Sequence, residues 1–139
     1  MANPADLSDV PLFAGLDDEE RTELARWFDE RTVGAGVRLC GKGIPGYSFF
    51  VLVAGSADVA SGDQTLGRLG PGDFFGEVAI LGDGRRSATV TTTAPSKLLT
   101  MFGTEFRRLQ SAQPAIAESI VQTMRARIAA DGAVEREPV

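Results

Sequence analysis

Residues 71–90 hold the side chains whose types and spacing best suit chemistry. Gly76–Leu81 is predicted to form one or two helical turns, and the first N–H groups of a helical turn are open donors for an anion. Arg85 and Arg86 follow a glycine-flanked turn, directly before a β-branched segment. An arginine that returns to the same place adds a planar fork of donors suited to phosphate oxygens. The pattern therefore predicts an anion site.

Glu77 gives this stretch an opposite character, because a carboxylate beside a phosphate repels it. Accepting a hydrogen bond from a sugar hydroxyl is a reason for such a residue to be there. Arginine, backbone amides and a carboxylate together indicate a small sugar phosphate or a nucleotide. The chain lacks the P-loop lysine motif, which argues against ATP, and the glycine-rich dinucleotide-binding motif, which argues against NAD. A surface salt bridge between Glu77 and Arg86 is the alternative, and spacing alone does not separate the two.

The elements that must position these residues follow from an uneven sequence. The 139 residues suit one domain. Residues 1–30 carry two basic and nine acidic side chains, whereas residues 31–102 carry seven basic and five acidic ones and 13 of the 16 glycines. We therefore divide the domain into an N-terminal helical segment (1–30), a β-structured middle (31–102) that contains residues 71–90, and C-terminal helices with a tail (103–139).

A helix is predicted near the end of the acidic segment. Asp17 is a suitable N-cap, and Glu20 completes a capping box three residues later. Leu24, Trp27 and Phe28 then recur at helical spacing through about residue 29. The apolar residues upstream of this helix predict a short turn.

The middle part predicts a small antiparallel sandwich or barrel. Short runs of β-branched and aromatic residues alternate with glycine-containing turns, at spacings of about 8–12 residues. The predicted strands are Ser48–Ala54, Ala57–Ser61, Gln64–Leu69, Ser87–Thr93 and Ser96–Phe102, with Arg31–Val33 and Val37–Cys40 as two further candidates.

The C-terminal part predicts two helices, Gly103–Gln110 and Pro114–Ala130. An apolar stripe recurs every four residues along the second helix, at Ile116, Ile120, Met124 and Ile128. In the simplest interpretation this stripe packs on the β-structure. The alternative is that it also forms a homodimer with a second copy of the chain, or closes over a ligand.

The lack of histidine and the single cysteine exclude whole classes of chemistry. The chain has no Ser-His-Asp or Cys-His pair, no histidine-ligated zinc or haem, no internal disulfide and no cysteine-ligated iron–sulfur cluster. An all-carboxylate site stays open, but no spacing fits a calcium-binding loop and we expect no metal. Cys40 follows a stretch of strand character, which favours a buried apolar role over a reactive thiol.

Charge and hydropathy predict a cytoplasmic protein. The net charge of −5 argues against nucleic acid as a partner. The longest apolar run, Phe49–Ala54, is too short for membrane insertion. The N-terminus lacks the basic start and apolar run of a secretion signal.

Phe75–Leu81 followed by Arg86–Val90 resembles the phosphate-binding cassette of cyclic nucleotide-binding domains, which occur in the bacterial catabolite activator, the regulatory subunit of cAMP-dependent protein kinase and cyclic nucleotide-gated channels. Pro11–Leu16 is similar to the opening turn of that family, and the resemblance extends over nearly the whole chain. It implies a mainly β fold with flanking helices, an antiparallel β-roll or jelly-roll barrel. It also implies a regulatory module and not an enzyme.

The resemblance assigns roles within the cassette. Glu77 would accept a hydrogen bond from the ribose 2′-OH, and Arg86 would bind the cyclic phosphate. The backbone N–H groups of Val78 and Ala79 would assist at the start of the short helix. Gly76 would allow close packing against the sugar.

The resemblance also assigns roles near the base of the implied ligand. Ser87 and Ala88 would lie beside the phosphate and the base. Family members selective for cGMP often have threonine where Ser87 stands, so the resemblance favours cAMP as the ligand over cGMP. Residues on the last helix usually close over the base, and Met124, Arg125 and Arg127 are the candidates.

The resemblance implies a switch. Nucleotide binding would move the C-terminal helices, and an effector protein or domain that the sequence does not identify would respond. No helix-turn-helix domain follows the last helix, so we expect a stand-alone sensor or the sensor part of a longer protein. One alternative is a degenerate domain of the same fold that binds no nucleotide and serves interaction or dimerisation. A cupin-type barrel enzyme is a second, disfavoured by the lack of histidine.

Overall fold

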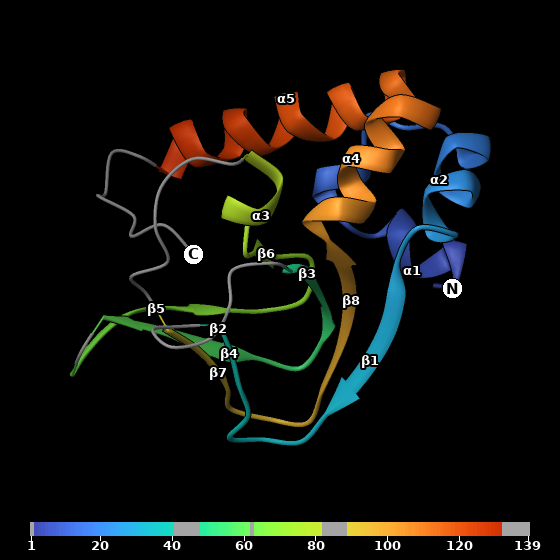
Figure 1. Cartoon of the computed structure of the whole chain (residues 1–139). Helices are drawn as coiled ribbons and strands as arrows, with labels where there is room; N and C mark the ends of the chain where they lie inside the picture. Colours follow the sequence, from blue (N-terminus) through green and yellow to red (C-terminus); the bar gives the residue numbers. More distant parts are fainter. Residues whose placement is uncertain (1, 41–47, 62, 82–88, 132–139) are drawn as a thin grey trace.

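The computed structural model describes residues 2–40, 48–61, 63–81 and 89–131 (Figure 1). Helices from both ends of the chain lie together on one side of the β-structure. The N-terminal part forms α1 (Pro4–Ser8), the 3-10 helix η1 (Pro11–Phe13) and α2 (Asp18–Ala25). The C-terminal part forms α4 (Gly103–Ala112) and α5 (Pro114–Asp131).

The capping box at the start of α2 is confirmed. Asp17 Oδ1 accepts a hydrogen bond from the Glu20 N–H at 2.8 Å, and Glu20 Oε1 accepts one from the Asp17 N–H at 3.1 Å. The helix ends earlier than the apolar spacing predicts. The N–H of Trp27 donates to the carbonyl of Leu24 three residues back, which tightens the last turn, and Asp29 already begins a strand.

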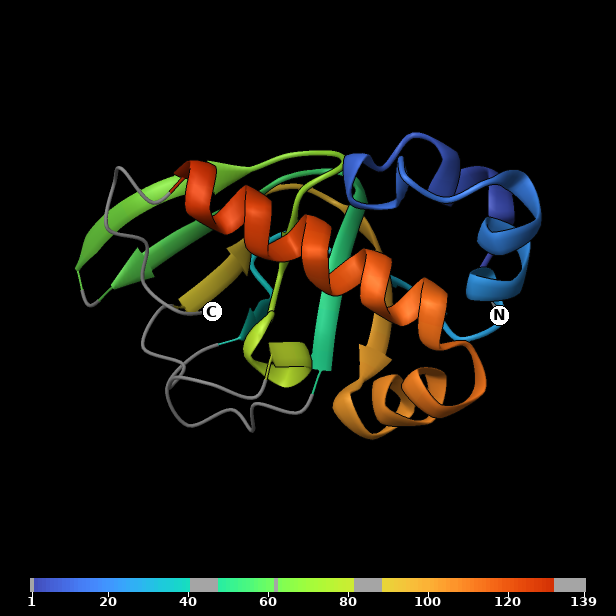
Figure 2. The same cartoon turned by 90° about the horizontal axis from the view of Figure 1, so that it is seen from above.

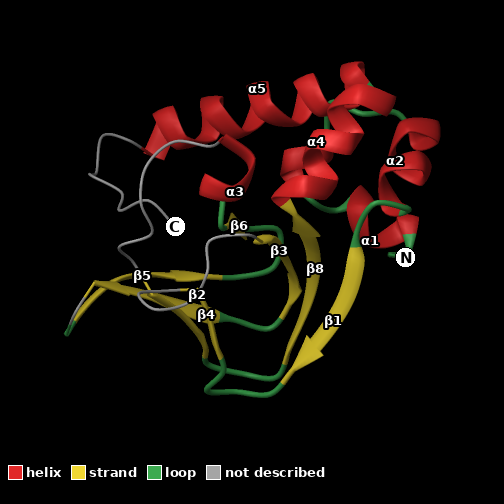
Figure 3. Ribbon diagram, in the orientation of Figure 1, coloured by secondary structure: helices red, strands yellow, loops and turns green. Residues whose placement is uncertain are grey.

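Eight strands among the described residues form two antiparallel sheets of four strands each (Figure 3). The first sheet has the order β1 (Asp29–Val33), β8 (Ser96–Phe102), β3 (Ser48–Ala54) and β6 (Phe74–Phe75). The second has the order β2 (Arg38–Cys40), β7 (Thr89–Thr92), β4 (Ala57–Ser61) and β5 (Gln64–Leu69). The predicted mainly β fold with flanking helices is confirmed, and β3, β4, β5 and β8 have the predicted bounds.

β3 separates two hydrophobic cores, and this explains its apolar run from Phe49 to Ala54. Alternate residues of a strand point to opposite faces of the sheet. Phe49 and Val51 lie in one core, Phe50 and Leu52 in the other, and all four are at most 4% exposed. A strand that is buried on both faces needs apolar residues at every position.

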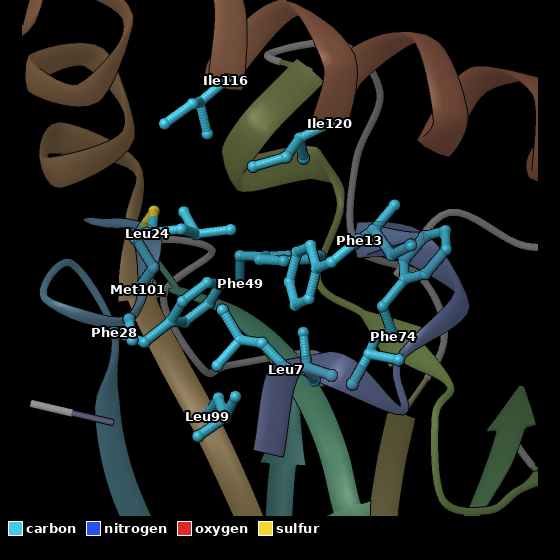
Figure 4. Packing of buried hydrophobic residues seen from close by; sticks show 14 of the residues in the cluster. Leu7, Phe13, Leu24, Phe28, Phe49, Phe74, Leu99, Met101, Ile116 and Ile120 are labelled. Carbon is cyan, nitrogen blue, oxygen red and sulfur yellow. The ribbon is translucent and has the colours of Figure 1, made fainter. Parts of the chain in front are cut away.

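The helix-side core lies between the first sheet and the helices (Figure 4), and its members include Leu7, Phe13, Phe28, Phe49, Leu99 and Ile120. The roll-interior core lies between the two sheets and consists of Leu39, Cys40, Phe50, Leu52, Ala57, Val59, Phe75, Val90 and Leu98. Each core contains paired rings. Phe13 and Phe28 are tilted with centroids 5.7 Å apart, and Phe50 and Phe75 are stacked at 4.8 Å.

α5 runs across the helical side of the molecule, with the short helix α3 (Val78–Leu81) to one side of it (Figure 2). Its stripe residues Ile116, Ile120 and Met124 are at most 4% exposed and belong to the helix-side core. The side chain of Ile128 lies outside the described part. A homodimer through α5 would therefore use residues other than these three. In the part of the chain that the structure describes, no helix, α5 included, combines the length and apolarity needed to cross a bilayer.

Candidate functional site

A tight turn fastens the approach to the cassette onto β3 and η1. The N–H of Gly70 donates to Asp73 Oδ2 at 2.8 Å, which closes the turn. Gly72 donates to the carbonyl of Leu52 at 2.7 Å, and Leu52 donates back to Asp73 at 2.8 Å. Gly72 has φ +93°, a conformation that suits glycine, and a Cβ there would lie 3.2 Å from Pro11 Cδ.

β6 anchors the start of the cassette in both cores. Its two residues pair with Val51 and Phe50 of β3. Phe74 points into the helix-side core and Phe75 into the roll-interior core, and they are 6% and 0% exposed. Two large buried rings on opposite faces fix the position of the next residue, where the chain leaves the sheet.

Gly76 makes the turn from β6 into α3. Its φ is +78°, in the left-handed region where side chains with a Cβ are strained. Its carbonyl accepts a hydrogen bond from the N–H of Ala79 at 3.0 Å. The backbone conformation, beyond any closeness to a ligand, therefore requires glycine here.

Glu77 is buried, with 6% of its surface exposed. Its backbone carbonyl accepts from the N–H groups of Ile80 at 3.0 Å and Leu81 at 2.8 Å, so the residue also holds the first turn of α3 together. A buried carboxylate is stable only when hydrogen-bond donors or a cation surround it. The site thus places the buried carboxylate of Glu77, a hydrogen-bond acceptor, directly after the turn at Gly76.

α3 lies next to α4, and the two meet through backbone atoms. Gly103, the first residue of α4, is buried, and a Cβ built on it would lie 2.7 Å from the carbonyl oxygen of Ala79. Sequence reasoning treated Gly103 only as the start of a helix. A lone glycine between a strand and a helix is the signal that could have identified a close contact.

The described residues contain four of the seven predicted ligand-binding positions. Gly76, Glu77, Val78 and Ala79 follow one another in the turn and in α3, with only the backbone of Val78 described. Arg86, Ser87 and Ala88 lie outside the described residues, so their predicted roles stay predictions.

The three candidates on the last helix differ in burial. Met124 is fully buried in the helix-side core, whereas Arg125 and Arg127 are exposed. Only the arginines therefore have side chains outside the core in this state. Within the described ranges, no three histidine, cysteine, aspartate or glutamate side chains gather into a group that could hold a metal ion.

Comparison with known proteins indicates the same family as the cassette motif does. The family model of the cyclic nucleotide-binding domain matches residues 30–113. The chain is 40% identical over 114 residues to a cyclic nucleotide-gated potassium channel of Rhizobium etli, and 34% identical over 105 residues to a cAMP-dependent protein kinase regulatory subunit of Colletotrichum orbiculare. These matches cover 82% and 74% of this chain but only 32% and 27% of the relatives, so it spans about a third of their length.

Solved structures share the fold. The N-terminal domain of a transcriptional regulator from Streptomyces coelicolor A3(2) is 28% identical with a TM-score of 0.75, over 95% of this chain and 98% of that one. The catabolite activator protein of Thermus thermophilus is 27% identical with a TM-score of 0.74, over 87% of this chain and 59% of that one.

Proposed function

The chain belongs to the family of cyclic nucleotide-binding domains, and from this premise we propose that it is a regulatory module that responds to cAMP. The placement of Glu77 carries the proposal, since its buried carboxylate directly follows the left-handed Gly76 at the start of α3. The 2′-hydroxyl of a cyclic nucleotide is a neutral donor, and a carboxylate at this position can accept its hydrogen bond.

The proposed contacts divide between the two halves of the cassette. Glu77 accepts from the ribose 2′-OH, and Arg86 binds the cyclic phosphate, assisted by backbone N–H groups at Val78 and Ala79. The N–H of Ala79 donates to the carbonyl of Gly76 at 3.0 Å. A phosphate oxygen must therefore share that bond or replace it, which makes Val78 the simpler backbone donor of the two.

We favour cAMP over cGMP because the residue after the cassette arginine is Ser87 and not threonine. The exposed Arg125 and Arg127 are the proposed contacts to the base from α5. No catalytic step is proposed, because a binding module needs only a difference in affinity between two conformations to act. The proposed effector is a protein or domain that responds to the movement of the C-terminal helices.

The alternative is a degenerate module of the same fold that binds no nucleotide. Calorimetric titration with cAMP and with cGMP separates the two proposals. We expect heat of binding with cAMP and weaker binding of cGMP. The absence of both heat and a thermal shift at millimolar nucleotide would favour the degenerate module.

Two substitutions test the assigned contacts. Glu77→Gln and Arg86→Ala are each expected to weaken cAMP binding about tenfold or more, because each removes a charge-assisted hydrogen bond. Glu19→Gln and Arg38→Ala are matched controls at exposed positions on α2 and β2, and should leave affinity unchanged. Unchanged affinity in Arg86→Ala would place the phosphate elsewhere.

A further inference from the structure

We propose that Gly103 is a positioning residue whose backbone contact with Ala79 sets the cassette against the C-terminal helices and transmits ligand binding between them. The transmission part of this proposal rests on the proposed function. The contact itself can be tested in the ligand-free protein.

The contact leaves no room for a side chain. A Cβ on Gly103 would lie 2.7 Å from the Ala79 carbonyl oxygen and 3.6 Å from its carbonyl carbon, well inside van der Waals contact for the oxygen. Both partners are backbone groups, so neither can rotate out of the way. Arg107 Nη1 would also lie 3.0 Å away, but the end of a flexible side chain can move.

Backbone conformation does not account for this glycine. The glycines with positive φ are Gly36, Gly55, Gly72 and Gly76 among the described residues, and Gly103 is not one of them. It begins a helix, where alanine is favoured over glycine. The close approach of Ala79 is therefore the physical reason for a glycine at this position.

The contact joins the two parts of the molecule that ligand binding is proposed to couple. On the cassette side, Ala79 is bonded through its N–H to Gly76, so a shift of its carbonyl moves the turn that carries Glu77. On the helical side, Gly103 leads into Phe106 and Leu109 of α4, which are buried in the helix-side core together with the stripe of α5. Close-packed groups transmit small displacements because they cannot absorb them.

Gly103→Ala tests the contact, and Gly15→Ala is the matched control. A Cβ on Gly15 would meet Ser119 Oγ of α5 at 3.5 Å, an ordinary contact, so this variant also adds a methyl group between α5 and another segment, but without a clash. A third variant, Arg107→Ala, separates the effect of the guanidinium from that of the carbonyl.

Amide hydrogen exchange and amide chemical shifts are measured first without ligand. Gly103→Ala is expected to shift the amide signals of Ala79 to Leu81 and to speed their exchange, with cooperative unfolding retained. Gly15→Ala and Arg107→Ala are expected to leave these amides unchanged. Unshifted cassette amides in a folded Gly103→Ala would overturn the contact as a positioning device, whether or not the protein binds cAMP.

Calorimetry with cAMP then tests transmission. We expect Gly103→Ala to weaken binding about tenfold, and Gly15→Ala to stay within twofold of the wild type. If Gly103→Ala does not fold, a cAMP titration of the wild type decides instead, since the Gly103 amide must then shift more than the amides of Gly15 and Gly67. Equal shifts, or unchanged affinity in the variant, would overturn transmission through Gly103. A wild type that binds no nucleotide would overturn the proposed function and with it transmission, leaving the contact to the ligand-free test.

Discussion

The two hydrophobic cores differ in what they hold together. The roll-interior core is built from strand residues of both sheets, whereas the helix-side core joins helices from the two ends of the chain to one face of the first sheet. β3 contributes side chains to both cores from its two faces, and β6 contributes one phenylalanine to each core. The cassette therefore leaves the sheet at a point that is held by both cores, through Phe74 and Phe75. We expect a change at the cassette to reach the helices through the contact of Ala79 with Gly103, and the roll-interior core to keep its packing.

The largest expected effect is a loss of stability in the roll-interior core. Phe75→Ala should lower the free energy of unfolding by about 3–5 kcal/mol, because it removes a fully buried ring stacked on Phe50. Urea denaturation measures the loss. Phe102→Ala is the control, since Phe102 is 55% exposed and should change stability little. Equal losses in the two variants would contradict the assignment of Phe75 to a core.

Ile120→Ala, in the helix-side core, should lower the free energy of unfolding by about 2–5 kcal/mol. Its effect is expected to be local, because Ile120 holds α5 on the helix-side core. In Ile120→Ala, amide hydrogen exchange should become faster in α5 and change less in β4 and β7. In Phe75→Ala, exchange should become faster in the helix and in the strands. If Ile120→Ala affects the strands as strongly as the helix, the two cores form one cooperative unit and the comparison fails.

A smaller effect is expected where a charged group supports the helix-side core. Arg21 Nη1 donates to the carbonyls of Phe13, the last residue of η1, at 3.2 Å, and of Leu16. Arg21→Met should lower the free energy of unfolding by about 1–3 kcal/mol, because it removes the side-chain donor to the Leu16 carbonyl and one of the two donors to the Phe13 carbonyl. Arg26→Met is the matched control at the C-cap of the same helix, with a side chain that is 64% exposed. Similar losses in both variants would argue against a specific role for Arg21.

The smallest expected effect is a dependence on pH. Lys97 Nζ lies 2.7 Å from Asp6 Oδ2 and 2.8 Å from Glu30 Oε1, and joins α1 to the first sheet. Hydrogen bonds to Asp6 and Glu30 raise the pKa of Lys97 above its ordinary value of 10.5. A lysine whose pKa is raised in the folded state contributes its full stability at pH values below its pKa in the unfolded chain. This contribution is lost as the pH rises through its pKa in the folded state.

Lys97→Met should therefore show a constant deficit in stability from pH 7 to pH 9, and the deficit should shrink as the pH is raised beyond about 10.5. Urea denaturation at pH 7, 9 and 11 measures it, with Arg26→Met as the cationic control. A deficit of the same size at pH 11 would mean that packing of the lysine stem, and not its charge, is responsible.

The parts of the fold with a regular period were predictable from the sequence. The alternation that marks strands and the capping box at Asp17 are local signals, and both are confirmed. β6 was missed, because two residues are too few to show a period, and α1 was missed because only five residues form it. The end of α2 was placed too late, since the apolar spacing of Trp27 and Phe28 continues through the turn that terminates the helix.

The candidate site was predictable in its residue types but not in its geometry. The cassette motif predicts Gly76 and Glu77 as site residues, yet neither the positive φ of Gly76 nor the burial of Glu77 follows from local sequence. The contact between Gly103 and Ala79 joins residues 24 positions apart, and such a contact depends on how a strand and two helices pack. Long-range packing of this kind leaves only a weak trace in the sequence, a single glycine.

Cys40 is fully buried within the roll-interior core and is the one thiol of the chain. A thiol without solvent access reacts slowly with maleimide reagents. A second cysteine introduced at the exposed position 126 of α5, as Ala126→Cys, would therefore be the preferred target for a fluorophore. The native protein is in this sense already prepared for site-selective labelling, and the emission of such a probe would follow α5 through a nucleotide titration.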